Sequence, residues 1–327
     1  MKIINWAVIF VLILLFVFVI NSLDQQNNRV NLQLQIRYNK AVDTATQDAA
    51  NALMNNTSQP QESQYESTKQ TRINKEAAAD TFLRTMYLNF NVAHDHIGQQ
   101  VLNGYIPALI VIGYDGYYIY QFESYRNEAG ETEFRHVWSP KKTYTYTDQQ
   151  HNIYAFTLDD YVTIRLAADG KWLHGFRSEL QEQAQMKLLD DEHTFDAIRR
   201  TTIVNALQND LAHTINRYNA DAKRYGVSYT FTVPYIPQQD WNNTINDAGV
   251  LAFVQGIPLG TQYYNNYALG GAKIVKTDTF TGIVAEGRKY YFSTRSCQSP
   301  YAAAEMFTSA KEAAEKGYFP LACTRRY

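Results

Sequence analysis

The first 23 residues carry the feature that most constrains this chain, an apolar run with no charged side chain after Lys2. Residues 6–20 read WAVIFVLILLFVFVI, and Ile3 and Ile4 extend the run, interrupted only by Asn5. A helix needs about 20 mostly apolar residues to cross about 30 Å of hydrocarbon. We therefore expect residues 1–23 to form a transmembrane signal anchor, with membrane lipid as its partner, rather than a buried core helix.

A cleaved signal peptide is the alternative to an anchor. Lys2 supplies a minimal basic region before the apolar run, as a signal peptide requires. The sequence after the run has a small residue at Ser22, but Ile20 is too large for the other position of an A-x-A cleavage site. This exit sequence favours an uncleaved anchor.

Basic residues near the ends of a membrane segment indicate its orientation, although large domains translocate largely regardless of charge. Lys2 precedes the segment, and Arg29, Arg37 and Lys40 follow it only after an acidic residue, Asp24. We predict a single-pass cell-membrane protein with a cytoplasmic N-terminus and an extracytoplasmic C-terminal domain.

Residues 24–55 continue the apolar run without a helix breaker, since they contain neither proline nor glycine. Apolar or small residues recur at the spacing of one helix face. We therefore expect an amphipathic stalk helix that continues the helix of the anchor without a break. Anchor and stalk together would form a rod about 75 Å long. The alanines imply close packing on the chain's own domain or on a neighbouring subunit, and the predicted assembly face is Leu34, Tyr38, Ala41, Ala45, Ala49 and Leu53.

The remaining chain divides by composition. Residues 56–72 are almost without apolar side chains and read as a polar linker, and residues 73–290 are expected to form an α+β extracytoplasmic domain. Helical patterns cover about 74–102, 178–224 and 300–316. Asp115-Gly116 between two strand-like runs predicts a β-hairpin, and further strand patterns follow up to residue 176 and again at 227–235, 250–255, 272–276 and 289–294.

The predicted fold class is therefore α+β, a single N-terminal transmembrane helix continuing into a long amphipathic helix, followed by a mainly antiparallel sheet with helices. Strands and helices do not alternate as a doubly wound fold requires. The net charge of −2 gives no bias toward nucleic acid as a partner. The twenty-five tyrosines suit a sheet in which the rings pack and the hydroxyl groups stay in water, or an aromatic platform that binds glycans or peptides.

No catalytic, metal-binding or cofactor-binding residue emerges from the motifs, and we predict that the protein is not an enzyme. His94 and His96 would diverge on a helix, and we interpret them as surface residues. The carboxylates Asp115, Glu123, Asp148, Asp159 and Asp160 lie at predicted turns and strand ends, where acidic residues are common without catalysis. The two glycines and three tyrosines of a glycine- and tyrosine-rich segment form a possible binding loop, Gly256, Gly260, Tyr263, Tyr264 and Tyr267.

Cys297 and Cys323 are the only cysteines, and outside the cytoplasm an even pair is most simply a disulfide, with two free thiols as the alternative. Residues 295–297 (RSC), 307–318 (FTSAKEAAEKGY) and 320–323 (PLAC) resemble a small cysteine-containing module that is appended to bacterial nucleases and surface proteins. The resemblance implies a disulfide- or metal-stabilised knuckle. Because the expected histidine step before the first cysteine is Tyr291-Phe292, a disulfide is favoured over zinc in this C-terminal helical module, residues 291–327.

The order of short N-terminus, membrane helix, amphipathic helix and α+β head resembles type IV pilins and minor pilins of the tight-adherence type, as do residues 47–50 (QDAA) and the alanine-rich stripe. The resemblance implies a non-enzymatic component of a bacterial surface, pilus-like or secretion and transfer apparatus, which meets protein partners or its own copies through the N-terminal helix. An extracytoplasmic ligand-binding sensor or accessory domain of PAS or Cache type, and an anchored cell-wall or glycan-acting enzyme, are the alternatives. The Gly-Phe or Gly-Met dipeptide of a pilin processing site does not precede the apolar run at residues 6–20.

Overall fold

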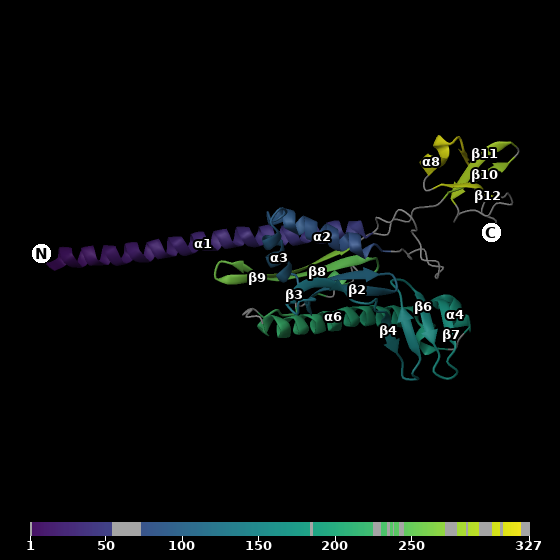
Figure 1. Cartoon of the computed structure of the whole chain (residues 1–327), viewed down its shortest axis with the longest axis horizontal. Coiled ribbons are helices and arrows are strands. Elements are labelled where there is room, and N and C mark those ends of the chain that lie inside the picture. Colours follow the sequence, from purple (N-terminus) through teal and green to yellow (C-terminus); the bar gives the residue numbers. More distant parts are fainter. Residues whose placement is uncertain are drawn as a thin grey trace. The chain divides into compact units, whose positions relative to one another are not determined.

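The computed structural model of the chain describes residues 2–53, 73–183, 186–224, 230–233, 236–237, 239–241, 245–271, 280–285, 287–293, 303–307 and 310–321. The chain divides into two compact units, Met1–Ile274 and Val275–Tyr327. A long N-terminal helix and two antiparallel sheets belong to the first unit, and a small sheet belongs to the second (Figure 1). The α+β class with a long N-terminal helix and antiparallel sheets is thus confirmed.

The first unit follows a simple order of helices and strands. Three helices come first: α1 (Lys2–Ala52), α2 (Lys75–Asn89) and α3 (His96–Gly104). Seven strands follow: β1 (Ala108–Gly113), β2 (Gly116–Arg126), β3 (Thr132–Trp138), β4 (Tyr144–Thr147), β5 (Ile153–Phe156), β6 (Tyr161–Arg165) and β7 (Trp172–Phe176). The unit ends with α4 (Arg177–Gln183), α5 (Lys187–Asp190), α6 (Glu192–Arg224), β8 (Gly249–Leu259) and β9 (Gln262–Gly271).

A five-stranded antiparallel sheet in the order β3-β2-β1-β8-β9 forms the centre of this unit. The β1–β2 hairpin pairs Gly113 with Gly116, which confirms the turn predicted from Asp115-Gly116. The central strand β1 is buried at every residue. Since successive side chains of a strand point to opposite faces, Val111 packs into one hydrophobic cluster and Ile112 into another.

Helices α1 and α2 cover one face of this sheet (Figure 1). Asn74 caps the start of α2, because its side-chain oxygen accepts a hydrogen bond of 3.0 Å from the Ala77 N–H. Phe82 and Met86 of α2 are fully buried and meet Val111 of the sheet in one cluster. Burial of these side chains fixes the second half of α1 and α2 on the sheet.

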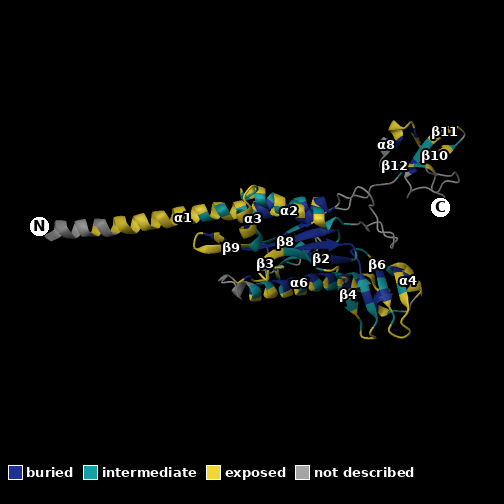
Figure 2. Ribbon diagram, in the orientation of Figure 1, coloured by how far each residue is buried: buried dark blue, intermediate teal, exposed yellow. Residues whose placement is uncertain are grey.

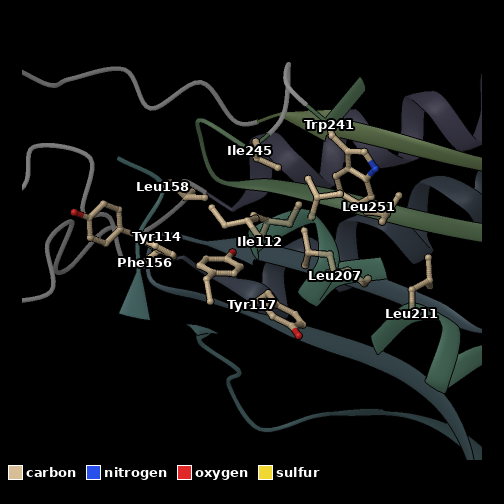
Figure 3. Packing of buried hydrophobic residues seen from close by; sticks show 14 of the residues in the cluster. Ile112, Tyr114, Tyr117, Phe156, Leu158, Leu207, Leu211, Trp241, Ile245 and Leu251 are labelled. Carbon is tan, nitrogen blue, oxygen red and sulfur yellow. The ribbon is translucent and has the colours of Figure 1, made fainter. Parts of the chain in front are cut away.

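Helix α6 covers the other face of the central sheet, and a second sheet, in the order β4-β5-β6-β7, contributes side chains to the same hydrophobic cluster. Figure 3 shows Leu207 of α6 beside Ile112 and Leu251 of the central strands, and Leu211 of α6 belongs to the same cluster. The helical region predicted over 178–224 is confirmed, and three helices, α4, α5 and α6, occupy it. The backbone is extended at Asp191, whose carboxylate accepts a 2.9 Å bond from the Thr194 N–H and so starts α6 as a new helix.

The second unit contains β10 (Phe280–Ala285), β11 (Arg288–Ser293), β12 (Ala303–Phe307), α8 (Ala310–Glu315) and β13 (Phe319–Pro320). Its sheet has the order β12-β10-β11-β13, in which the short β13 runs parallel to β11. The unit starts at residue 275 rather than 291, because β10 pairs with β12, so that both strands belong to one sheet. Within the described residues of the helix predicted over 300–316, residues 303–307 form the strand β12 and residues 310–315 form the short α8, so one helix over this range is wrong.

Helix α1 is a single element from Lys2 to Ala52, so the prediction that one unbroken helix runs through this part of the chain is confirmed. Its side chains are described at Phe10 and from Leu14 onward. None of the helices in the described part of the chain is both long enough and apolar enough to cross a membrane.

Candidate functional site

The second half of α1 is part of the core of the first unit. Ala41, Ala45, Ala49 and Leu53 are buried, and Leu34 and Tyr38 are half-buried, so that all six residues of the predicted assembly face lie against α2 or the central sheet or at the edge of that contact. Of the two partners that the sequence left open for this face, the chain's own domain is the one seen here. The role of this face in assembly with a neighbouring subunit stays a prediction.

Small residues on both sides allow α1 to lie very close to the sheet. A Cβ atom at Gly270 of β9 would stand 2.6 Å from the backbone oxygen of Thr46 and 3.1 Å from the side chain of Ala50. The contact continues along the strand, where Asn39 of α1 accepts hydrogen bonds from Tyr264 at 2.9 Å and from Asn266 at 3.1 Å. α1 therefore runs beside β9 and in the same direction.

The first half of α1 projects from the unit (Figures 1 and 2). The side chain of Asn31 contacts the turn of the β8–β9 hairpin at Gly260, and on the N-terminal side of this contact the described side chains are exposed. The exposed large apolar residues of this half include Phe10, Leu14, Leu15, Phe16, Val17, Phe18, Val19, Ile20, Leu23 and Val30. An apolar projection of this kind is the marker of a surface that meets a membrane or another protein.

Two further apolar residues lie on the outer face of α1 where its inner face already contacts the head. Leu32 is 57% exposed and Ile36 is 58% exposed. They are four residues apart and therefore lie on the same face, nearly opposite to Leu34 and Tyr38. This outer face was not predicted from the sequence, because the apolar pattern of the inner face dominates the segment.

The segment at residues 256–267, which the sequence predicted as a possible binding loop, is a β-hairpin and not a loop. Gly256 has φ 88° at a bulge in β8, and Gly260 has φ 59° in the turn before β9. Tyr264 is buried against α1, and Tyr267 donates a 3.0 Å hydrogen bond to Asp240. Only Tyr263 among the three tyrosines is exposed, at 49%. The hairpin packs on α1 through Tyr264, and binding by this segment stays a prediction.

A groove of about 790 Å³ opens where α2, α3 and the end of α6 leave β2 and β3 uncovered. Its size and mixed lining are those of ligand sites in general. Aromatic side chains form its floor, with Leu83 and Val101 on the helical side and Tyr218 at one end. The floor residues are Tyr120, Phe122, Phe134 and His136.

The floor of the groove is a row of aromatic rings from neighbouring strands. Phe122 lies 5.7 Å from Phe134 and 4.9 Å from His136, and His136 is stacked on Tyr120 at 4.9 Å, measured between ring centroids. Cross-strand aromatic pairs of this kind stabilise a sheet. The sequence predicted a strand over 134–138. The groove, however, depends on how α2 and α3 pack on the sheet, and this packing cannot be predicted from a local sequence pattern.

Burial sets the electrostatics of the groove. Burial lowers the pKa of His136 to about 4, although a hydrogen bond with the Ile106 carbonyl acts in the opposite direction. The His136 ring is therefore neutral at neutral pH, and its Nε2 atom, 2.8 Å from the Ile106 oxygen, is the donor. Burial also raises the pKa of the Tyr218 hydroxyl to about 12, and this hydroxyl donates to Gly104 O at 2.7 Å. The polar atoms around the groove are uncharged hydrogen-bonding groups apart from Glu133 and Arg135.

The carboxylates that the sequence singled out are held by separate structural contacts. Asp159 accepts from Tyr114 and Thr157, both at 2.8 Å, and Asp148 accepts from Tyr154 at 3.0 Å. Asp115 lies 2.5 Å from the Lys141 ammonium in another part of the sheet. These contacts are those of turn and strand ends, as the sequence suggested.

His94 and His96 are exposed around the start of α3, where Asp95 caps the helix through a 3.1 Å bond from the Ile97 N–H. Within the described ranges, no three histidine, cysteine or acidic side chains gather as metal ligands would. Cys297 and Cys323 lie outside the described residues, and the predicted disulfide stays a prediction.

Fold and site together define an α+β protein in which one helix is both part of the core and a long apolar projection. Comparisons of the chain with protein-family models, with curated proteins and with solved structures found no match.

Proposed function

We propose that this chain is a membrane-anchored, extracytoplasmic and non-enzymatic component of a bacterial surface, pilus-like or secretion and transfer apparatus. In this proposal the first 23 residues anchor the chain, the N-terminus is cytoplasmic, and α1 is the element that assembles with neighbours. The observation that carries the proposal is the projection of α1, which is rigidly continuous with the core at one end and apolar at the other.

The dimensions of the projection suit an anchor. Residues 2–30 form a helix of about 43 Å, whereas the hydrocarbon core of a bilayer is about 30 Å thick. If the apolar run spans the bilayer, about 13 Å of helix separates it from the head, so that the turn at Gly260 lies close to the membrane surface. The support for the span itself is the run at residues 6–20, of which the side chains at 6–9 and 11–13 are not among those described.

The outer face of α1 supports assembly. Leu32 and Ile36 are exposed side chains on a helix that the head already holds in place, so a neighbouring helix can pack on them without any rearrangement of the core. Removing such apolar surface from water is favourable by about 25 cal/mol per Å². The non-enzymatic part of the proposal is supported by the structural contacts of Asp148 and Asp159, which occupy both carboxylates with local hydrogen bonds.

Membrane fractionation tests the anchor. We expect the full chain to stay with membranes after an alkaline carbonate wash. The double variant Leu14→Arg/Phe18→Arg should be released, because each charge near the bilayer centre costs about 3 kcal/mol on insertion scales. The matched control Gln25→Arg/Gln33→Arg adds the same charges beyond the apolar run and should stay bound. Release of the unmodified chain by the wash would overturn the anchor.

Site-directed crosslinking tests the assembly face in membranes. In a background with Cys297→Ser and Cys323→Ser, the variant Ile36→Cys should form crosslinked dimers, whereas Leu34→Cys, on the face turned to the head, should not. Equal crosslinking at both positions, or none at Ile36→Cys and Leu32→Cys, would show that α1 does not mediate assembly.

A further inference from the structure

Strand β3 lies at one end of the central sheet, where it pairs with β2 alone among the described residues. It is seven residues long, contains neither proline nor glycine, and keeps a regular register with β2 from Thr132 to Trp138. Residues 132–135 are exposed. Edge strands of this kind are templates for a further strand unless a bulge, a proline or a covering element protects them.

The register shows which backbone groups of β3 point away from the sheet. Ser139 N–H donates to Ile119 O at 2.8 Å, and Asn127 N–H donates to Glu131 O at 2.9 Å, so these pairs mark the hydrogen-bonded positions. Because such positions alternate along an antiparallel pair, residues 133, 135 and 137 bond to β2. The backbone groups of Thr132 and His136 are directed to the outer edge.

The side chains beside this edge differ between its two faces. Thr132, Phe134 and His136 line the groove, together with Val101, which is 55% exposed on α3. Glu133 and Arg135 alternate with them and place one negative and one positive charge at the same edge. The Glu133 carboxylate accepts hydrogen bonds from Tyr125 and Asn127, and the Arg135 guanidinium lies over the Tyr125 ring. A backbone edge, a groove with an aromatic floor and a charge pair therefore run along one strand.

We propose that the β3 edge and its groove bind an extended segment of a partner protein, which adds to the central sheet as an antiparallel strand. The partner's backbone pairs with Thr132 and His136, which is the β-augmentation mode of peptide recognition. Its apolar side chains enter the groove toward Val101. An acidic residue of the segment lies opposite Arg135, and a basic residue two positions later lies opposite Glu133.

A second copy of this chain is the other candidate occupant. Its β3 strand has the order Glu-x-Arg, an acidic residue followed two positions later by a basic one, as the partner segment requires. Two β3 strands paired antiparallel would be related by a two-fold axis perpendicular to the sheet. Since α1 runs along β9, this axis would turn the two α1 helices in opposite directions. Under the proposed anchoring in one membrane that arrangement is impossible, and a different protein is the occupant that fits.

The test uses a labelled peptide with the sequence of residues 130–138 (GETEFRHVW), which has the required order of charges and apolar residues. Fluorescence anisotropy measures its binding to the full chain in detergent micelles. Methylation of the peptide nitrogen at the His position removes a bond to Thr132 and should weaken binding about tenfold. Methylation at the neighbouring Val position, whose N–H points away from β3, is the matched control and should change binding less than about twofold.

A charge exchange checks the register. The double variant Glu133→Arg/Arg135→Glu keeps the net charge and should bind the peptide about tenfold more weakly. A peptide in which the Glu at position 133 and the Arg at position 135 are exchanged should restore the affinity to within about twofold of the original pair. This rescue also shows that the variant is folded.

Four results would overturn the proposal. The first is no binding of the peptide at any concentration that stays soluble. The second is equal weakening by the two methylated peptides, which would show that the backbone edge is not used. The third is a dimer of the full chain in sedimentation that the single variant Arg135→Glu dissociates and the double variant Glu133→Arg/Arg135→Glu restores, because a second copy would then be the occupant. Loss of peptide binding in competition with an oligosaccharide would likewise assign the groove to glycans.

Discussion

Acidification should destabilise the first unit through one histidine, His136. Burial lowers its pKa to about 4, against 6.5 for the free side chain. A group whose pKa is lower in the folded state contributes stability that is fully present above its unfolded pKa. That contribution is lost as the pH falls from about 6.5 toward about 4, because the unfolded chain then binds a proton that the folded unit excludes.

The size of the effect follows from the two pKa values. Between about pH 7 and about pH 5, the unfolded state gains a proton on His136 while the folded state stays neutral, and the free energy of unfolding falls by about 2 kcal/mol. The carboxylates with lowered pKa values, such as Asp148 and Asp169, remain ionised in this window. The predicted loss thus precedes the general acid denaturation of the fold.

Denaturant titrations followed by tryptophan fluorescence measure this loss. All four tryptophans lie at residues 6, 138, 172 and 241, within the first unit, so the signal reports that unit alone. The variant His136→Gln keeps a donor for the Ile106 carbonyl but cannot titrate, and it should lose the pH dependence. His213→Gln, at an exposed position of α6, is the control and should keep it. An unchanged pH dependence in His136→Gln would refute the reasoning.

Two further substitutions test the contacts that hold the first unit together. Gly270→Val should destabilise it by about 2 kcal/mol or more in thermal unfolding, because its Cβ would stand 2.6 Å from a backbone oxygen of α1 that cannot move away without the whole helix; an unchanged melting temperature would mean that α1 is not packed on β9. Asp210→Asn should cost about 1 kcal/mol, since this half-buried carboxylate accepts 2.6 Å bonds from both Tyr117 and Lys142. Asp80→Asn removes only an exposed ion pair with Arg84 and should be nearly neutral, so equal effects of the two substitutions would contradict this distinction.

Residues 1–55 show how far local patterns reach. The absence of proline and glycine from residue 23 to 55 was enough to predict one unbroken helix, and the structure has it from Lys2 to Ala52. The alanine stripe likewise predicted a closely packed face. Which partner the stripe meets was not predictable, because small residues suit a neighbouring subunit and the chain's own sheet equally well.

The candidate site shows where local patterns fail. Glycine and tyrosine are common in binding loops and in tight hairpins, so the segment at 256–267 was open to either interpretation, and its pairing across β8 and β9 decided for the hairpin. Asp191 ends one helix and caps the next, a break that apolar periodicity alone does not reveal. The groove over β2 and β3 involves residues from α2, α3 and α6 that are far apart in the sequence.

By itself, the sequence of this chain determined the elements with strong local signals: the continuous N-terminal helix, the hairpin at Asp115-Gly116 and the α+β class. These depend on the backbone preferences and apolar spacing of neighbouring residues, which are fully written in a short window. The tertiary structure alone decided that α1 packs its alanines on its own sheet, that Leu32 and Ile36 remain outside, and that β3 is an uncovered edge beside a groove. Those features depend on contacts between distant segments, whose free energy no local pattern records.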